Sequence, residues 1–125
     1  MTTVLIVEDE MYLAMMAEDI LLDAGHQVFK AARLPNALAL AAAERFDAAL
    51  LDINLAGVEV FPLAEELRRR GVPFTFTSGY GTNGIPPDYR DYPVLQKPYI
   101  AEQLVDTVTA MLASGEADRN ARDPG

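Results

Sequence analysis

The sequence contains no cysteine and no long apolar run. The first absence excludes disulfides, thiolate metal sites and cysteine nucleophiles together. No run approaches the roughly 18 residues that a membrane span needs. Glu8 interrupts the first apolar stretch, so we do not expect a secretory signal segment at the start of the chain. We therefore expect a cytoplasmic protein that does not associate with membranes.

Basic residues are also scarce: 10 Lys and Arg stand against 19 Asp and Glu, which gives a formal net charge of -9. A nucleic-acid surface needs clustered cations that release counterions, so this balance argues against one. The one basic run, Arg68-Arg69-Arg70, ends a predicted helix, where cations offset the helix dipole. We interpret it as a helix end and not as a docking patch.

The 125 residues are enough for one domain with a sizeable core. Strand and helix patterns alternate along the chain, which predicts an α/β domain with a mostly parallel sheet. The expected strands are 3–7, 27–31, 48–51, 73–77 and 94–96, and the expected helices are 11–24, 34–44, 61–70 and 100–113. We interpret Met11, Met15, Met16 and Met111 as helix packing. The domain is expected to cover residues 1–113, followed by a disordered polar tail over 114–125.

One segment breaks the alternation. Residues 79–93 read GYGTNGIPPDYRDYP, with three glycines and three prolines. Each interior proline costs a helix about 3 kcal/mol and each glycine about 1 kcal/mol, so a regular fourth helix is not expected here. A long connection without regular structure is often functional, which predicts an irregular or mobile element.

Polar side chains follow four of the predicted strands. Glu8 and Asp9 follow the first, Asp52 the third, Ser78 the fourth and Lys97 the last. Ligands of open α/β sheets bind outside the carboxyl ends of the strands, so these groups should meet in one pocket. Each alone fits an ordinary helix start, turn or surface position. Together, carboxylates for a hard cation, a hydroxyl and an ammonium predict a site for a phosphoryl group on an aspartate.

The motifs VEDE, LLDINL, TFTSGYG and QKPY carry a family resemblance. In this order and spacing, over residues 3–113, they resemble the response-regulator receiver domain. The FTSGY run also resembles the FATGUY subgroup of single-domain receivers. The resemblance implies a flavodoxin-like, doubly wound five-stranded parallel sheet in the order 2-1-3-4-5. It also implies a two-component signalling protein that is not an enzyme.

The same resemblance assigns roles to single residues. Asp52 would be the phosphoacceptor, while the Ser78 hydroxyl and the Lys97 ammonium would bind phosphoryl oxygens. Mg²⁺ would be held by Glu8, Asp9, Asp52 and the backbone carbonyl of Asn54, with Glu8 binding directly or through water. The Lys97-Pro98 peptide bond would be cis.

The resemblance further implies a histidine kinase or a histidine phosphotransfer protein as phosphodonor, and a downstream protein partner. His26 precedes the second strand and is interpreted as a surface residue, so the donor histidine belongs to another protein. No output domain is expected after residue 113, which predicts signalling by protein contact, or service as a phosphate shuttle or sink.

One family position departs from the pattern. Receivers commonly carry Tyr or Phe three residues before the lysine, where this chain has Val94. The usual aromatic switch is therefore in question. Tyr80 is one candidate to replace it, and Tyr92 is a weaker one.

Two other interpretations remain open. A haloacid-dehalogenase-like phosphatase also uses an aspartate nucleophile with Mg²⁺, but expects a second acid where this chain has Asn54. A degenerate receiver would bind partners without being phosphorylated, and the complete set of acidic, hydroxyl and lysine residues argues against it.

Overall fold

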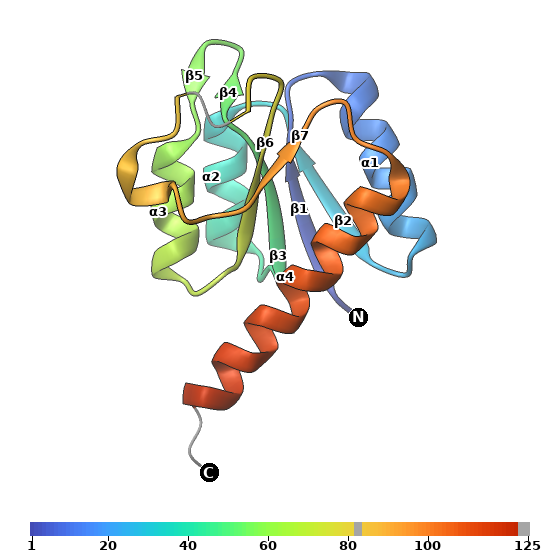
Figure 1. Cartoon of the computed structure of the whole chain (residues 1–125), viewed down its shortest axis with the longest axis vertical. Helices are drawn as coiled ribbons and strands as arrows, with labels where there is room; N and C mark the ends of the chain where they lie inside the picture. The colour runs from blue at the N-terminus through green and yellow to red at the C-terminus, as the bar shows by residue number, and fades with distance from the viewer. Residues whose placement is uncertain (82–83, 123–125) are drawn as a thin grey trace.

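The computed structural model describes residues 1–81 and 84–122, with residues 116–122 described as backbone only. Its centre is a five-stranded parallel sheet in the order β2-β1-β3-β6-β7 (Figure 1). The strands are β1 (Thr3–Val7), β2 (Gln27–Ala31), β3 (Ala48–Asp52), β6 (Phe74–Ser78) and β7 (Val94–Gln96). This is the flavodoxin-like order 2-1-3-4-5 that the family resemblance implies, because β4 and β5 form a separate hairpin.

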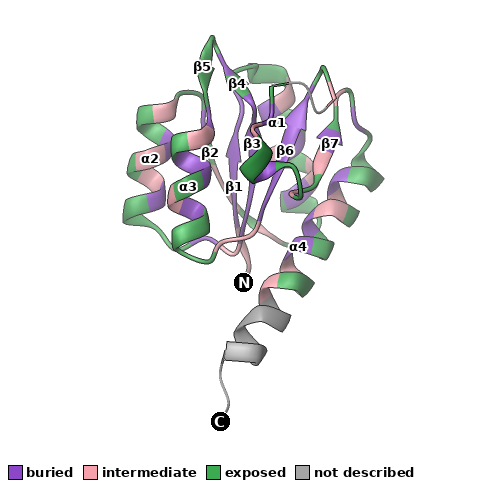
Figure 2. Cartoon of the chain, turned by 60° about the vertical axis from the view of Figure 1, so that its left-hand side comes forward, coloured by how far each residue is buried: buried purple, intermediate pink, exposed green. Residues whose placement is uncertain are grey.

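Two helices cover each face of the sheet (Figure 1). The helices are α1 (Met11–Asp23), α2 (Leu34–Ala43), α3 (Phe61–Arg69) and α4 (Ala101–Arg122). Alternate residues of a strand point to opposite faces, so β1 sends Leu5 and Val7 toward α2 and α3, and Val4 and Ile6 toward α1 and α4. Burial on both faces explains why the sheet centre is a continuous apolar run, and all five residues of β3 are buried (Figure 2). Among the described residues no helix is long and apolar enough to cross a membrane.

A small antiparallel hairpin follows β3, and the sequence analysis did not predict it. Its strands are β4 (Asn54–Leu55) and β5 (Val58–Glu59). The turn residues Ala56 and Gly57 have φ angles of 50° and 87°, the left-handed conformation that two-residue hairpin turns need. Two-residue strands are too short to show an alternating pattern, and Ala in the first turn position hides the usual Asn-Gly signal.

The segment between β6 and β7 contains no α-helix in its described residues, which confirms the predicted irregular element. It holds one short 3-10 helix, η1 (Pro87–Tyr89). Ile85 and Tyr89 are buried in the core that lies under α2 and α3. The part of the segment after Gly84 is therefore packed on the sheet. Thr82 and Asn83, which also belong to the segment expected to be mobile, lie outside the described residues.

The last helix differs from the prediction of a disordered tail over residues 114–125. The backbone of α4 is helical to Arg122, well past residue 113. Helices propagate from an established turn, and Ala, Glu and Arg favour that propagation, so a single Gly115 does not end it. A Cβ added at Gly115 would lie 3.4 Å from the Pro73 ring, so the glycine lets α4 pass the start of β6 closely. Residues 123–125 of the predicted tail lie outside the described residues.

Candidate functional site

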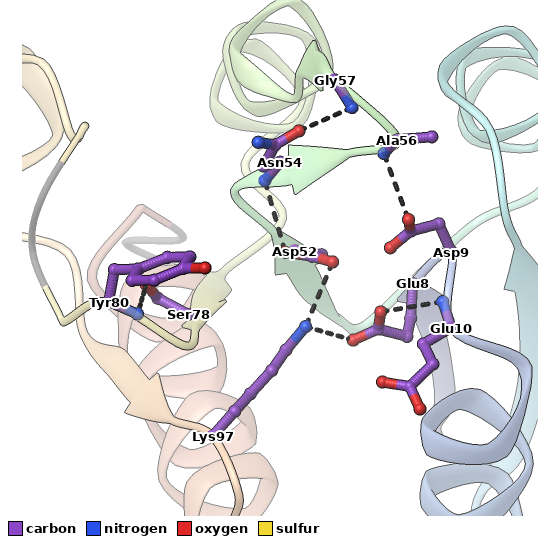
Figure 3. A network of polar contacts seen from close by, with 10 residues as sticks. All are labelled: Glu8, Asp9, Glu10, Asp52, Asn54, Ala56, Gly57, Ser78, Tyr80 and Lys97. Carbon is purple, nitrogen blue, oxygen red and sulfur yellow. Dashed lines mark hydrogen bonds and ion pairs between the residues drawn. The ribbon is translucent and has the colours of Figure 1, made fainter.

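The register of the sheet brings the polar strand ends to one edge. Val7 pairs with Leu51, Asp52 with Thr77, and Ser78 with Gln96, so each polar residue is at or just beyond its strand's carboxyl end. The β4–β5 hairpin rises beside the same edge, at the top of Figure 1. Here the structure places Glu8, Asp9, Asp52, Asn54, Ser78 and Lys97 together (Figure 3).

Lys97 connects the acidic side chains across the site. Its Nζ lies 2.6 Å from Glu8 Oε1 and 3.1 Å from Asp52 Oδ2. Burial alone would lower the pKa of Lys97, but hydrogen bonding and charge from Glu8 and Asp52 raise it, so the side chain stays an ammonium. The Lys97-Pro98 peptide bond, which leads the chain away from the site, is cis as expected.

Asp52 is buried at the carboxyl end of β3, with 7% of its surface exposed. Burial and the nearby charge of Glu8 raise the pKa of Asp52 to about 7, although Lys97 acts in the opposite direction. Asn54 stabilises the carboxylate by donating its backbone N–H to Asp52 Oδ1 at 3.3 Å. The carboxyl group is therefore poised between its charged and neutral forms at neutral pH.

Asp9 lies at the open side of the site, next to the hairpin. The backbone N–H of Ala56 donates to Asp9 Oδ2 at 3.2 Å. Burial would raise the pKa of Asp9, but hydrogen bonds involving Asp52, Glu8 and the Ala56 backbone outweigh it and lower the pKa. Asp9 therefore remains a carboxylate at neutral pH.

The acidic side chains fit a hard divalent cation. Glu8, Asp9 and Asp52 each offer one carboxylate oxygen, and the three oxygens lie within 4.8 Å of one another. Carboxylate oxygens completed by water and phosphate are the ligands that Mg²⁺ prefers. Glu8 is 5% exposed, accepts a hydrogen bond from the Glu10 backbone at 3.0 Å and binds Lys97. The role of the Asn54 carbonyl as a further ligand stays a prediction.

Ser78 completes the site on the β6 side. Its Oγ accepts a hydrogen bond from the Tyr80 backbone N–H at 3.0 Å, which leaves the hydroxyl proton available for an acceptor. Ser78 is buried, whereas the Tyr80 side chain is 83% exposed. The hydroxyl is therefore held in place while the tyrosine ring stands at the mouth of the site.

A cavity of about 570 Å³ joins these groups. It is lined by Asp9, Asp52, Ile53, Asn54, Ala56, Gly57, Glu59, Phe61, Ser78, Gly79, Tyr80, Gly84 and Lys97. Glu59 is the one of these acids that sequence reasoning missed, since it follows no long strand. The only signal that could have found it was recognition of the hairpin that carries it.

The structure distinguishes the two candidates for the missing aromatic switch. Tyr92 is stacked on Phe74, with ring centroids 4.3 Å apart and planes inclined by 7°. This stack places Tyr92 in the aromatic cluster on β6, and Tyr92 does not line the cavity. Tyr80 does line it.

Comparison with known proteins agrees with this arrangement. The family model of the response regulator receiver domain matches residues 4–109. No curated protein matches the chain. The solution structure of SdrG from Sphingomonas melonis Fr1 is 38% identical, covers 90% of this chain and 97% of its own, and superposes with a TM-score of 0.79.

Two further solved structures share the fold. A response regulator receiver protein from Sinorhizobium medicae WSM419 is 24% identical, with a TM-score of 0.77 and coverage of 91% of this chain and 96% of that one. A CheY-like receiver domain protein from Methanospirillum hungatei JF-1 is 24% identical, with a TM-score of 0.85 and coverage of 94% and 98%. The chain belongs to the response regulator receiver domain family.

Proposed function

We propose that this protein is a single-domain response regulator that accepts a phosphoryl group on Asp52 from a histidine kinase or a histidine phosphotransfer protein. The observation that carries this proposal is the bridge from Lys97 to both Glu8 and Asp52 beside a cluster of three carboxylates. The Lys97 ammonium, which lies between Asp52 and Glu8, can transfer its contact from Asp52 to an oxygen of the incoming phosphoryl group.

The transfer is a displacement at phosphorus. A carboxylate oxygen of Asp52 forms a bond to phosphorus, the bond from phosphorus to the donor imidazole nitrogen breaks, and the electron pair stays on that nitrogen. Lys97 would then exchange its contact with Asp52 for a phosphoryl oxygen, and the Ser78 hydroxyl would donate to another. Such transfers depend on positioning and charge neutralisation more than on covalent chemistry by the protein.

Mg²⁺ fits the carboxylates of Glu8, Asp9 and Asp52. When bound it would offset the repulsion between Asp52 and the incoming phosphate. The residues themselves contribute the arrangement: the hairpin holds Asp9 through Ala56, and β3 fixes Asp52. The Asn54 carbonyl would complete the protein ligands.

The solved structures of similar size support a single-domain regulator. The chain covers 97% of SdrG, 96% of the Sinorhizobium medicae protein and 98% of the Methanospirillum hungatei protein. We infer that the phosphorylated domain transmits its state by contact with another protein, or passes its phosphoryl group on as a shuttle or sink.

An exposed apolar surface on α1 is a candidate docking site for the phosphodonor. Four methionines were expected to pack in the helix interfaces, and this prediction is wrong for the three on α1. Met11, Met15 and Met16 are 73%, 48% and 38% exposed, whereas Met111 on α4 is buried. Tyr12, on the same helix, is 84% exposed. Exposed apolar clusters mark protein contacts, and α1 begins two residues after Asp9.

Intact mass tests the acceptor directly. After incubation with Mg²⁺ and phosphoramidate, whose P–N bond resembles that of phosphohistidine, the protein should gain the mass of one phosphoryl group. Asp52→Asn should gain none, whereas Asp19→Asn, an exposed change of the same kind on α1, should label fully. Full labelling of Asp52→Asn, or none of the parent protein, would overturn the proposal.

A second experiment tests the docking surface. Tyr12→Glu combined with Met15→Glu should slow transfer from phosphorylated histidine phosphotransfer proteins by about tenfold or more, and should leave labelling by phosphoramidate unchanged. Leu22→Glu, at the other end of α1 and 50% exposed, is the matched control. Equal transfer rates in all three proteins would exclude α1 as the docking site.

The phosphatase alternative makes a different prediction. A haloacid-dehalogenase-like enzyme would release phosphate from many equivalents of a phosphomonoester, whereas a receiver would stop after one phosphoryl group per chain and then decay. Asn54 stands where that enzyme family expects its second acid, and its side-chain oxygen accepts a hydrogen bond from Gly57 at 2.7 Å. This contact supports a structural task for Asn54 in the hairpin.

A further inference from the structure

Glu59 lies in the wall of the phosphorylation cavity, although nothing in the receiver resemblance assigns it a role. It belongs to β5, and it lines the same cavity as Asp52, Ser78 and Lys97. It pairs across the hairpin with Asn54. Cross-strand partners share one face of a hairpin, so Glu59 lies on the cavity side with Asn54, while Leu55 is buried in the core on the other face.

The hairpin ties the strand of Glu59 to the acceptor through Asn54. Asn54 donates its N–H to Asp52 Oδ1 at 3.3 Å, and its cross-strand partner is Glu59, whose Cα lies about 4.5–5.5 Å away in such a pair. The turn is fixed by two more hydrogen bonds, from Gly57 N–H to Asn54 Oδ1 at 2.7 Å and from Ala56 N–H to Asp9 Oδ2 at 3.2 Å. Glu59 is an exposed side chain on a backbone tied at several points to the site.

None of the other groups assigned to the cavity can serve as a base for the water that hydrolyses the aspartyl phosphate. Lys97 is a cation, Ser78 a hydroxyl donor, and Asp9 fits the cation site. An aspartyl phosphate is lost when water attacks phosphorus, and a carboxylate near the path of that water can orient it and accept its proton. Asn54 and Tyr80 carry no carboxylate, and Glu59 is the acid in the described cavity lining that neither belongs to the cation cluster nor is the acceptor.

We propose that Glu59 sets the lifetime of phosphorylated Asp52 by orienting the hydrolytic water and accepting its proton; this rests on Asp52 being the acceptor. The water oxygen forms a bond to phosphorus, the bond from phosphorus to the Asp52 oxygen breaks, and its electron pair returns to the Asp52 carboxylate. One water proton passes to a carboxylate oxygen of Glu59. The products are inorganic phosphate and free Asp52, and Glu59 then releases its proton to solvent.

The test follows the decay of the phosphorylated protein. The protein is labelled with phosphoramidate and Mg²⁺, separated from the donor, and followed by intact mass in excess Mg²⁺. Glu59→Gln, which keeps the size of the side chain, should lengthen the half-life by about tenfold or more, and Glu59→Ala should do the same. Glu59→Asp should recover part of the rate. Glu44→Gln, an exposed change of equal charge at the end of α2, should decay like the parent.

Two further measurements separate proton transfer from a structural effect. The decay in heavy water should be slower than in light water for the parent, and this isotope effect should shrink in Glu59→Gln. The affinity for Mg²⁺, measured by NMR titration, should be the same in both proteins. Unchanged or faster decay in Glu59→Gln, or slower decay matched by weaker Mg²⁺ binding, would overturn the role of Glu59 alone. A parent protein that takes up no phosphoryl group would overturn the acceptor assignment as well.

Discussion

At the scale of single residues, the fold disfavours the charged form of the Asp52 carboxyl group. The carboxyl group is nearly buried and shares the site with Glu8, and its pKa rises from 3.8 to about 7. A raised pKa in the folded state means that folding favours the protonated acid. Between these two pH values, the folded chain binds more protons than the unfolded chain, so stability falls as pH rises. The charged form of Asp52, the proposed acceptor, therefore lowers the stability of the fold.

This argument predicts that Asp52→Asn stabilises the protein at high pH. At pH 8 without divalent cations, the free energy of unfolding should increase by about 1–3 kcal/mol, because a buried charge near Glu8 is removed. The gain should shrink as pH falls toward 5, where the parent Asp52 is protonated and resembles Asn. Urea unfolding of both proteins across pH 5–8 measures it. A difference that stays constant with pH would contradict the raised pKa.

Thr75 is a buried polar residue whose hydroxyl group makes no hydrogen bond to the described residues. Its exposed fraction is 1%. An unpaired buried hydroxyl costs about 1–3 kcal/mol. Thr75→Val, which keeps the shape, should therefore raise the free energy of unfolding by about 1 kcal/mol in urea titration. Thr107→Val is the control, since that hydroxyl is paired with the Gln103 carbonyl at 2.7 Å. A loss of stability in Thr75→Val would show that the hydroxyl is satisfied in solution.

At the scale of elements, the segment between β6 and β7 has no α-helix in its described residues and is attached to the core by the buried ring of Tyr89. Tyr89 is buried, stacks on Phe61 with centroids 5.5 Å apart, and donates its hydroxyl to Glu65 Oε2 at 2.9 Å. The Arg68 guanidinium lies 5.0 Å from the centre of the Tyr89 ring. Helix α3 and the aromatic rings of β6 therefore hold η1 together. The freedom of the segment is expected near Gly79–Gly81 and Gly84, beside the site.

Two substitutions separate the parts of this anchor. Tyr89→Phe should cost about 1 kcal/mol of stability through the lost hydrogen bond to Glu65, whereas Tyr89→Ala should cost about 3–5 kcal/mol through the lost ring. In hydrogen exchange, Tyr89→Ala should release protection of the amides at 85–92 while those of β1 stay protected. Equal exchange in parent and Tyr89→Ala would show that the segment is held by other contacts.

At the scale of the whole molecule, the site is an edge shared by two separately packed cores. The core under α2 and α3 and the core under α1 and α4 meet at the central strands, and the polar groups gather where those strands end. The chain carries a net charge of -9, and the proposed phosphorylation of Asp52 would replace one carboxylate charge by the two charges of an acyl phosphate, a net gain of about one negative charge. A bound divalent cation should therefore stabilise the whole fold.

The expected size of that effect follows from mass action. At a Mg²⁺ concentration ten times its dissociation constant, the free energy of unfolding should rise by about 1.4 kcal/mol. Asp9→Ala should lose most of this gain because it removes both a ligand and a charge, and Asp23→Ala, far from the site at the end of α1, should keep it. Thermal unfolding with and without Mg²⁺ measures the difference. An equal gain in Asp9→Ala would mean that the cation binds elsewhere.

The sequence by itself determined the alternation of strands and helices and the residues of the site edge, and its motifs implied the sheet order through the family resemblance. Apolar periodicity and polar strand ends depend on local spacing, so Glu8, Asp9, Asp52, Ser78 and Lys97 could be found without coordinates. Only the tertiary structure decided what depends on contacts between distant segments. The β4–β5 hairpin is too short to have a period, and it exists through bonds such as that from Ala56 to Asp9. This hairpin, formed by contacts that no local pattern records, places Glu59 in the wall of the cavity that Asp52 also lines.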